Sequence, residues 1–270
     1  MRKAFLIFAA FCFLGTCSAA RAFAADGTWT KSWSVSGPGT QVRVEADFAD
    51  VHVIQATANS VHATVTTEYW RIPADVQVTG TQTSNEVEIR VETPKYHGGG
   101  LFHWHTPKVD IELEVPPHSQ LDLHTGFGNI RGENLQATAR VDTGFGGIRF
   151  PGFSGELTGD TGFGDVRANG RFDRLQLKTG FGSIRADIDS GSKMSEDWRL
   201  ESGFGSVHVL LPSDLNADIN ASSGFGHVST DVPLTLSETS SHSSVRGKLG
   251  AGGFPLELST GFGSVHIGRT

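Results

Sequence analysis

The stretch that decides the fold is Thr125-Gly126-Phe127-Gly128-Asn129-Ile130-Arg131, because its beginning returns throughout the second half of the chain. A TGFG or SGFG tetrapeptide begins at Thr125, Thr143, Thr161, Thr179, Ser202, Ser223 and Thr260. The first three intervals are 18 residues each, and the later ones are 23, 21 and 37 residues. Similarity at a fixed period indicates an array in which each unit contacts its neighbours.

Two degenerate copies extend this array. Residues 240–247 (SSHSSVRG) fall in the TGFGNIRG frame within the longest interval, and residues 46–52 (ADFADVH) lie far upstream. The sequence therefore contains nine recognisable units.

Each unit has the pattern strand, turn, strand. Residues 121–125 alternate apolar and polar side chains, residues 126–128 form a glycine-rich turn, and residues 129–131 resume the alternation. Glycine on both sides of the phenylalanine permits close approach of backbone from adjacent units, where a side chain would clash. These features predict an all-β protein, specifically a right-handed, single-stranded β-solenoid in which each unit forms one coil.

Stacked coils would align equivalent residues in columns. We interpret the phenylalanines as a buried stack rather than an exposed strip, because a strip would expose too much apolar area. We expect the aliphatic residues in the core, and the Thr or Ser before each first glycine to bond to the turn backbone. The phenylalanine column is Phe48, Phe127, Phe145, Phe163, Phe181, Phe204, Phe225 and Phe262. The aliphatic column is Val51, Ile130, Ile148, Val166, Ile184, Val207, Val228, Val245 and Val265.

The residue after each aliphatic position points outward. Four such residues in consecutive units form a candidate anion-contact stripe: Arg131, Arg149, Arg167 and Arg185. The sequence favours a solvated charge ladder instead, in which these arginines have nearby acids such as Asp142, Asp160 and Glu201 as neighbours.

The N-terminus predicts export. Arg2 and Lys3 precede a short apolar run, and residues 22–24 (AFA) offer a cleavage site, so residues 1–24 form a signal peptide. Cys12 and Cys17 both lie within it, so the mature chain has no disulfide. Thr16 stands where a lipobox needs a smaller residue, and we do not expect a lipid anchor on Cys17. We expect the protein in the periplasm, at the cell surface or outside the cell.

Removal of the signal leaves 19 basic against 29 acidic residues, a formal charge of −10. This charge disfavours nucleic acid as a partner, and no later segment has the length and apolarity of a membrane helix. Residues 25–118 are rich in predicted strands without a fixed period, and Pro116-Pro117 marks a boundary to the repeats at 119–270. The first region is expected to cap the array and to join its sheet.

At this point the chain resembles the bacterial putative-adhesin, β-strand-repeat family of unknown function. The resemblance rests on the signal peptide, the β-rich first half, Val115-Pro116 and the repeated t-G-f-G-x-[IV]-x units. It implies surface or envelope interaction, and it carries no catalytic residues.

Enzyme and metal chemistry find little support in the sequence. GxSxG, HExxH, GxxxxGK[ST] and CxxC are absent, and the position after GFG lacks the regular aspartate of calcium-binding repeats. Residues 95–105 contain His97, His103 and His105, which could hold a transition metal, although the glycine run favours a mobile hairpin tip. We therefore expect no enzyme activity and no cofactor. The sequence favours an adhesin-like module that contacts envelope polysaccharide or protein, with a structural envelope scaffold as the alternative.

Overall fold

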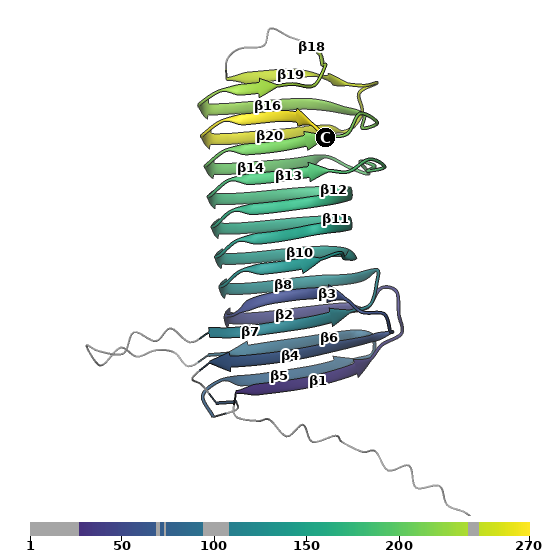
Figure 1. Ribbon diagram of the computed structural model, residues 1–270, viewed down its shortest axis with the longest axis vertical. Coiled ribbons are helices and arrows are strands. Elements are labelled where there is room, and N and C mark those ends of the chain that lie inside the picture. Colours follow the sequence, from purple (N-terminus) through teal and green to yellow (C-terminus); the bar gives the residue numbers. More distant parts are fainter. Residues whose placement is uncertain (1–26, 69–70, 73, 94–107, 237–242) are drawn as a thin grey trace, which may run out of the picture.

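The computed structural model describes residues 27–68, 71–72, 74–93, 108–236 and 243–270, and every regular element among them is a β-strand. All of these strands belong to one sheet (Figure 1). The strands are β1 (Thr28–Ser34), β2 (Gln41–Phe48), β3 (Asp50–Gln55), β4 (Ser60–Glu68), β5 (Gln77–Thr83), β6 (Glu86–Glu92), β7 (Lys108–Val115), β8 (Ser119–Phe127), β9 (Ile130–Glu133), β10 (Gln136–Phe145), β11 (Ile148–Phe163), β12 (Val166–Phe181), β13 (Ile184–Ile188), β14 (Trp198–Phe204), β15 (Val207–Leu211), β16 (Ala217–Phe225), β17 (Val228–Thr230), β18 (Thr235–Leu236), β19 (Ser244–Leu249), β20 (Pro255–Phe262) and β21 (Val265–Arg269). The predicted all-β class is confirmed.

The predicted β-solenoid of stacked coils is wrong, and the right-handed winding predicted for it does not apply. The strands form a single, nearly closed sheet of mixed direction. Pairing is antiparallel at both ends of this sheet, between β1, β4 and β7, between β5 and β6, and between β16, β19 and β18. A coil-by-coil stack would require every unit to lie parallel to the unit before it.

Chain order also fails to predict spatial order. The last unit, β20 and β21, lies between β14 and β15 on one side and β16 and β17 on the other. Thr260 is therefore level with both Ser202 and Ser223. Figure 1 accordingly shows the C-terminus within the body of the sheet, below β16 and β19. The 37-residue interval is long because the chain leaves its neighbour and returns to fill this gap.

The register between units follows the sequence repeat. Thr125, Thr143, Thr161 and Thr179 lie side by side on four successive parallel strands. The upstream copy joins them, because Phe48 is level with Phe127 and Val51 is level with Ile130. The first half of the chain thus shares the sheet, as expected. The described part of the copy at residues 240–247, which begins at residue 243, does not behave as a unit, since β19 runs antiparallel to β16.

Alternation of buried and exposed residues encloses a core along the inner face of the sheet. The aliphatic column is buried, apart from Val228, which is only partly covered. A second set of aromatic residues, not recognised in the repeat pattern, lies within this core. Phe150, Phe153, Phe172 and Trp198 are each no more than 1% exposed and contact one another in sequence.

Candidate binding surface

The glycines of each TGFG turn bring neighbouring units into backbone contact. A Cβ on Gly144 would lie 2.6 Å from the carbonyl oxygen of Gly126. Gly128 has φ +143°, and a Cβ there would overlap the carbonyl of Ala49. The expected clash is thereby confirmed, and each turn is fixed directly against the next.

The Thr/Ser column secures this contact. Its side chains are at most 7% exposed, and each hydroxyl donates to a carbonyl of the neighbouring turn. Thr143 donates to Gly128 at 2.9 Å, and Thr161 donates to Gly146 at 2.8 Å. The same bond recurs through Thr179, Ser202 and Thr260. The predicted role of these hydroxyls is confirmed, and the bond joins different units.

The phenylalanines of the turns form one continuous ladder, which we call the phenylalanine ladder. Neighbouring ring centroids are 4.7–4.8 Å apart, and ring planes are inclined by 1–7°. Its order is Phe48, Phe127, Phe145, Phe163, Phe181, Phe204, Phe262 and Phe225. With one ring per strand spacing, the ladder is about 33 Å long.

The expected burial of these rings is wrong. The six inner rings are 45–49% exposed, Phe48 is 37% exposed and Phe225 is 70% exposed. The reason lies in their position at the turn, outside the stretch where alternation directs side chains into the core. Each inner ring uses both faces to stack on its neighbours, so that the exposed part is the ring edge.

Acidic side chains border the ladder. The residue three positions before each ring forms an outward row along the same strands, with Glu45, Asp142, Asp160 and Glu201 as its carboxylates. Lys178 is its one fixed cation. This border disfavours a strongly anionic partner at the ladder.

The four arginines of the candidate stripe lie side by side on the outer face, in register from β9 to β13. The chain extends their row to His52 at one end and to His208 and His266 at the other. Among the described residues Arg131 pairs with Glu133, Arg167 with Asp165 at 2.8 Å, and Arg185 with Asp187 at 3.2 Å. Arg149 has no ion-pair partner in that part of the chain.

These partners differ from the acids proposed in the sequence. Asp142 contacts His124 at 3.1 Å, and Glu201 contacts Arg199 at 3.7 Å. The actual partners of Arg131 and Arg185 lie two residues further along the same strand, which places them on the same face. At the end of the row, burial, His266 and Arg185 together lower the pKa of His208.

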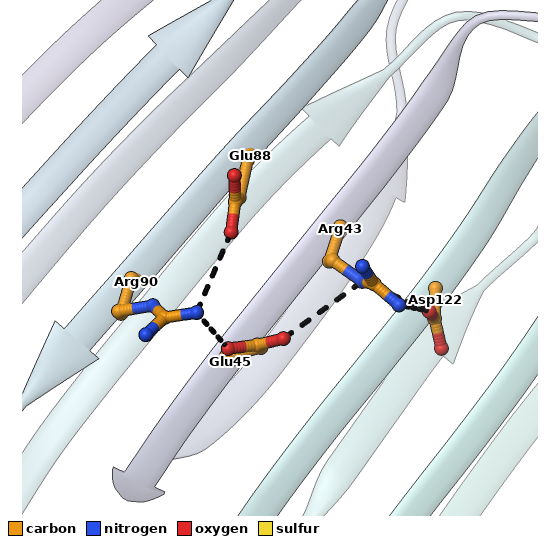
Figure 2. A network of polar contacts seen from close by, with 5 residues as sticks. All are labelled: Arg43, Glu45, Glu88, Arg90 and Asp122. Carbon is orange, nitrogen blue, oxygen red and sulfur yellow. Dashed lines mark hydrogen bonds and ion pairs between the residues drawn. The ribbon is translucent and has the colours of Figure 1, made fainter.

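A paired charge network lies on another part of the outer surface, on β6, β2 and β8 (Figure 2). Arg43 donates to Asp122 at 2.9 Å, and this hydrogen bond raises the pKa of Arg43. Arg90 contacts Glu45 at 2.6 Å and Glu88 at 3.6 Å, and Glu45 also faces Arg43. The network thus links β6, β2 and β8. In segments 41–45 and 86–90, charged residues of both signs recur at every second position. This sequence pattern would have predicted the network.

Beside this network an open groove of about 490 Å³ crosses the outer face of β2, β8, β10, β11 and β12, and Glu86 of β6 also lines it. Its lining is mainly polar, and the sequence analysis did not identify it. The reason is that the groove is made by side chains from six strands, and the order of these strands depends on contacts between distant parts of the chain.

The described residues contain neither a candidate metal site nor a membrane-spanning helix. In that part of the chain no group of three or more His, Cys, Asp or Glu side chains is placed to hold a metal ion. None of its elements is a long apolar helix of the kind that crosses a bilayer. The histidines at 97, 103 and 105, the predicted signal peptide and Cys17 lie outside the described residues.

No protein-family model matches the chain, and no curated protein matches its sequence. Several solved structures are similar over most of its length. A putative cell adhesion protein from Clostridium sporogenes is 11% identical with a TM-score of 0.44, covering 91% of this chain and 100% of its own. A putative adhesin from Bacteroides fragilis is 11% identical with a TM-score of 0.39, covering 90% and 98%. A putative lipid binding protein from Parabacteroides distasonis is 11% identical with a TM-score of 0.39, covering 89% and 96%.

The names of these structures confirm the resemblance to a putative-adhesin family that the sequence suggested. At such identities and TM-scores the similarity assigns no residue and no ligand to this chain.

Proposed function

We propose that this chain is an exported, non-enzymatic, adhesin-like interaction module of the cell envelope or extracellular space. The observation that carries the proposal is the phenylalanine ladder, in which eight rings in one row are each between 37% and 70% exposed. Together they offer on the order of 700 Å² of contiguous apolar surface. A strip of this size on a protein surface is typical of a contact site for a partner.

The geometry of the phenylalanine ladder favours some classes of partner over others. Sugars stack on ring faces, and the inner rings of the ladder have both faces occupied by neighbouring rings. Only their edges are free, and the bordering row carries four carboxylates against one lysine. An uncharged apolar surface on an envelope component therefore suits the ladder better than a glycan or an anionic lipid. The alternative function is a structural envelope scaffold without a specific ligand.

Co-sedimentation of the mature chain with isolated bacterial envelopes tests the proposal. The variant Phe145→Tyr, Phe163→Tyr, Phe181→Tyr keeps the stacked rings and adds a hydroxyl at each exposed edge. Burial of an unpaired hydroxyl in a contact costs about 1–3 kcal/mol, so this variant should bind envelopes at least about tenfold more weakly than the wild type.

Phe254→Tyr is the matched control, because Phe254 is 47% exposed but lies outside the ladder. It should sediment with envelopes as the wild type does. If no form of the protein sediments with envelopes, the scaffold function is favoured. Equal sedimentation of all three forms would assign attachment to another surface.

A further inference from the structure

The open groove across β2, β8, β10, β11 and β12 lies on the same strands as the phenylalanine ladder but at a distance from it. Asp122, Arg140, Thr158 and Gln176 line the groove, and each precedes its ladder ring by five residues. Five residues of extended strand correspond to about 16 Å. The groove is therefore a separate surface, and an inference about it goes beyond the function proposed for the ladder.

Uncharged polar side chains are repeated along the groove. Gln41, Gln120 and Gln176 contribute amides, and Thr138 and Thr158 contribute hydroxyls. None of these five side chains forms a hydrogen bond with another described residue. Amides and hydroxyls both donate and accept hydrogen bonds, and here they recur at the spacing of neighbouring strands. The two threonines are short and lie between longer side chains on the neighbouring strands, Thr138 between Gln120 and Glu156 and Thr158 between Arg140 and Gln176, which explains the hollow.

The charges of the groove balance. Arg43, Arg140 and Arg174 face Glu86, Asp122 and Glu156. Arg43 is paired with Asp122 at 2.9 Å, as in Figure 2, and Arg174 is paired with Glu196 at 3.1 Å. A lining without net charge gives no general attraction to a polyanion.

Some polar groups of the groove nevertheless lack an interaction partner among the described residues. Within the described part of the chain, Arg140 and Glu156 have no ion-pair partner, in contrast to the fully paired charges beside them in Figure 2. The Nε of Arg174 is enclosed and lacks a hydrogen-bond partner. Enclosed donors without partners are rare in folded proteins, and this one belongs to a residue of the groove lining.

We propose that this groove binds a segment of an uncharged, linear polysaccharide laid across the strands. Sugar hydroxyls, like the groove's amides and threonines, act as both donors and acceptors, and a linear glycan presents them at regular intervals. No aromatic ring lines the groove among the described residues, so that each contact is weak by itself. Many copies of the protein on one surface would strengthen attachment through multivalency.

Native affinity electrophoresis tests this proposal without envelopes. Gels contain soluble neutral glucan, mannan or xylan as probes, with polygalacturonate as the anionic comparison. The mature protein should be retarded by at least one neutral polymer, and the variant Arg149→Gln, Arg167→Gln, which weakens the candidate anion-contact stripe, should be retarded by that polymer more than by polygalacturonate. The variant Gln120→Ala, Gln176→Ala should raise the dissociation constant for that polymer about tenfold or more, with an unchanged thermal unfolding midpoint.

The matched control is Gln77→Ala, Gln136→Ala, which removes two exposed amides outside the groove and should leave retardation unchanged. Thr158→Arg, which fills the hollow, provides a second loss variant. The ladder variant with three tyrosines should keep its retardation even where it loses envelope binding, so the two proposals can fail separately. The groove proposal is overturned if no neutral polymer retards the wild type, if polygalacturonate retards the variant Arg149→Gln, Arg167→Gln more than the neutral polymer does, or if both groove variants are retarded like the wild type.

Discussion

The rings of Phe145 and Phe163 lie face to face, with centroids 4.7 Å apart and planes inclined by 2°, yet nearly half of each side chain is exposed. A stacked but exposed ring should contribute less to stability than a ring in the core. Phe163→Ala loses two stacking contacts and part of its buried area, and we expect it to lower the free energy of unfolding by about 1–2 kcal/mol.

The comparison for this prediction is Phe172→Ala, since Phe172 is fully buried. That change should cost about 3–5 kcal/mol. Urea unfolding of both variants measures the difference, and equal losses would show that the ladder rings belong to the core.

The turn glycines should tolerate no side chain. A Cβ on Gly162 would lie 2.6 Å from the carbonyl oxygen of Gly144. Neither backbone can move without disturbing the hydrogen bonds between neighbouring strands. We expect Gly162→Ala to lower the free energy of unfolding by about 2–3 kcal/mol.

Gly147→Ser is the control for this effect, because Ser183, Ser206 and Ser264 occupy the equivalent position in other units. Ser183 accepts a hydrogen bond there from the backbone N–H of Ser206. The control should change stability by less than about 1 kcal/mol. A tolerated Gly162→Ala would contradict the close backbone approach.

Stability should depend on His208 below neutral pH. Burial, His266 and Arg185 lower the pKa of His208 from its usual value of 6.5. The folded protein therefore binds this proton less readily than the unfolded chain, and stability falls as the pH drops through 6.5 toward the lower folded value.

His208→Asn should remove this part of the pH dependence. Urea unfolding at about pH 7.5 and about pH 5.5 should show a smaller loss of stability in the variant than in the wild type. The nearby contact of His266 with Asp231 at 3.5 Å is retained in both proteins. Equal losses would mean that His208 titrates alike in the folded and unfolded states.

The arginine row remains a candidate anion-contact stripe. Arg149→Gln together with Arg167→Gln removes one unpaired guanidinium and one that is paired with Asp165 on the surface. We expect weaker attachment to an anionic polysaccharide at low salt and a change in stability below about 1 kcal/mol. Unchanged attachment with a clear loss of stability would make the row structural.

The sequence predicted those features that depend on neighbouring residues within one unit. Alternation placed Ile130 and Ile148 in the core, and the hydroxyl before each glycine pair identified Thr143 and Thr161 as turn contacts. It failed for Phe127 and its equivalents, because a residue at the tip of a turn lies beyond the alternating stretch. The place of β20 between β14 and β16 could not be predicted, since strand order depends on contacts between distant units. The same dependence on strand order hid the groove.

Hydroxyl-radical footprinting of the envelope-bound protein tests the central claim most directly. In the free protein, Phe127, Phe145, Phe163 and Phe181 should be oxidised, while the buried Phe150, Phe153 and Phe172 should be protected. When the protein is bound to envelopes, oxidation of the ladder rings should fall severalfold, and Phe254 should be oxidised as before. Unchanged oxidation of the ladder rings in the bound protein would contradict the claim that the phenylalanine ladder is the contact surface.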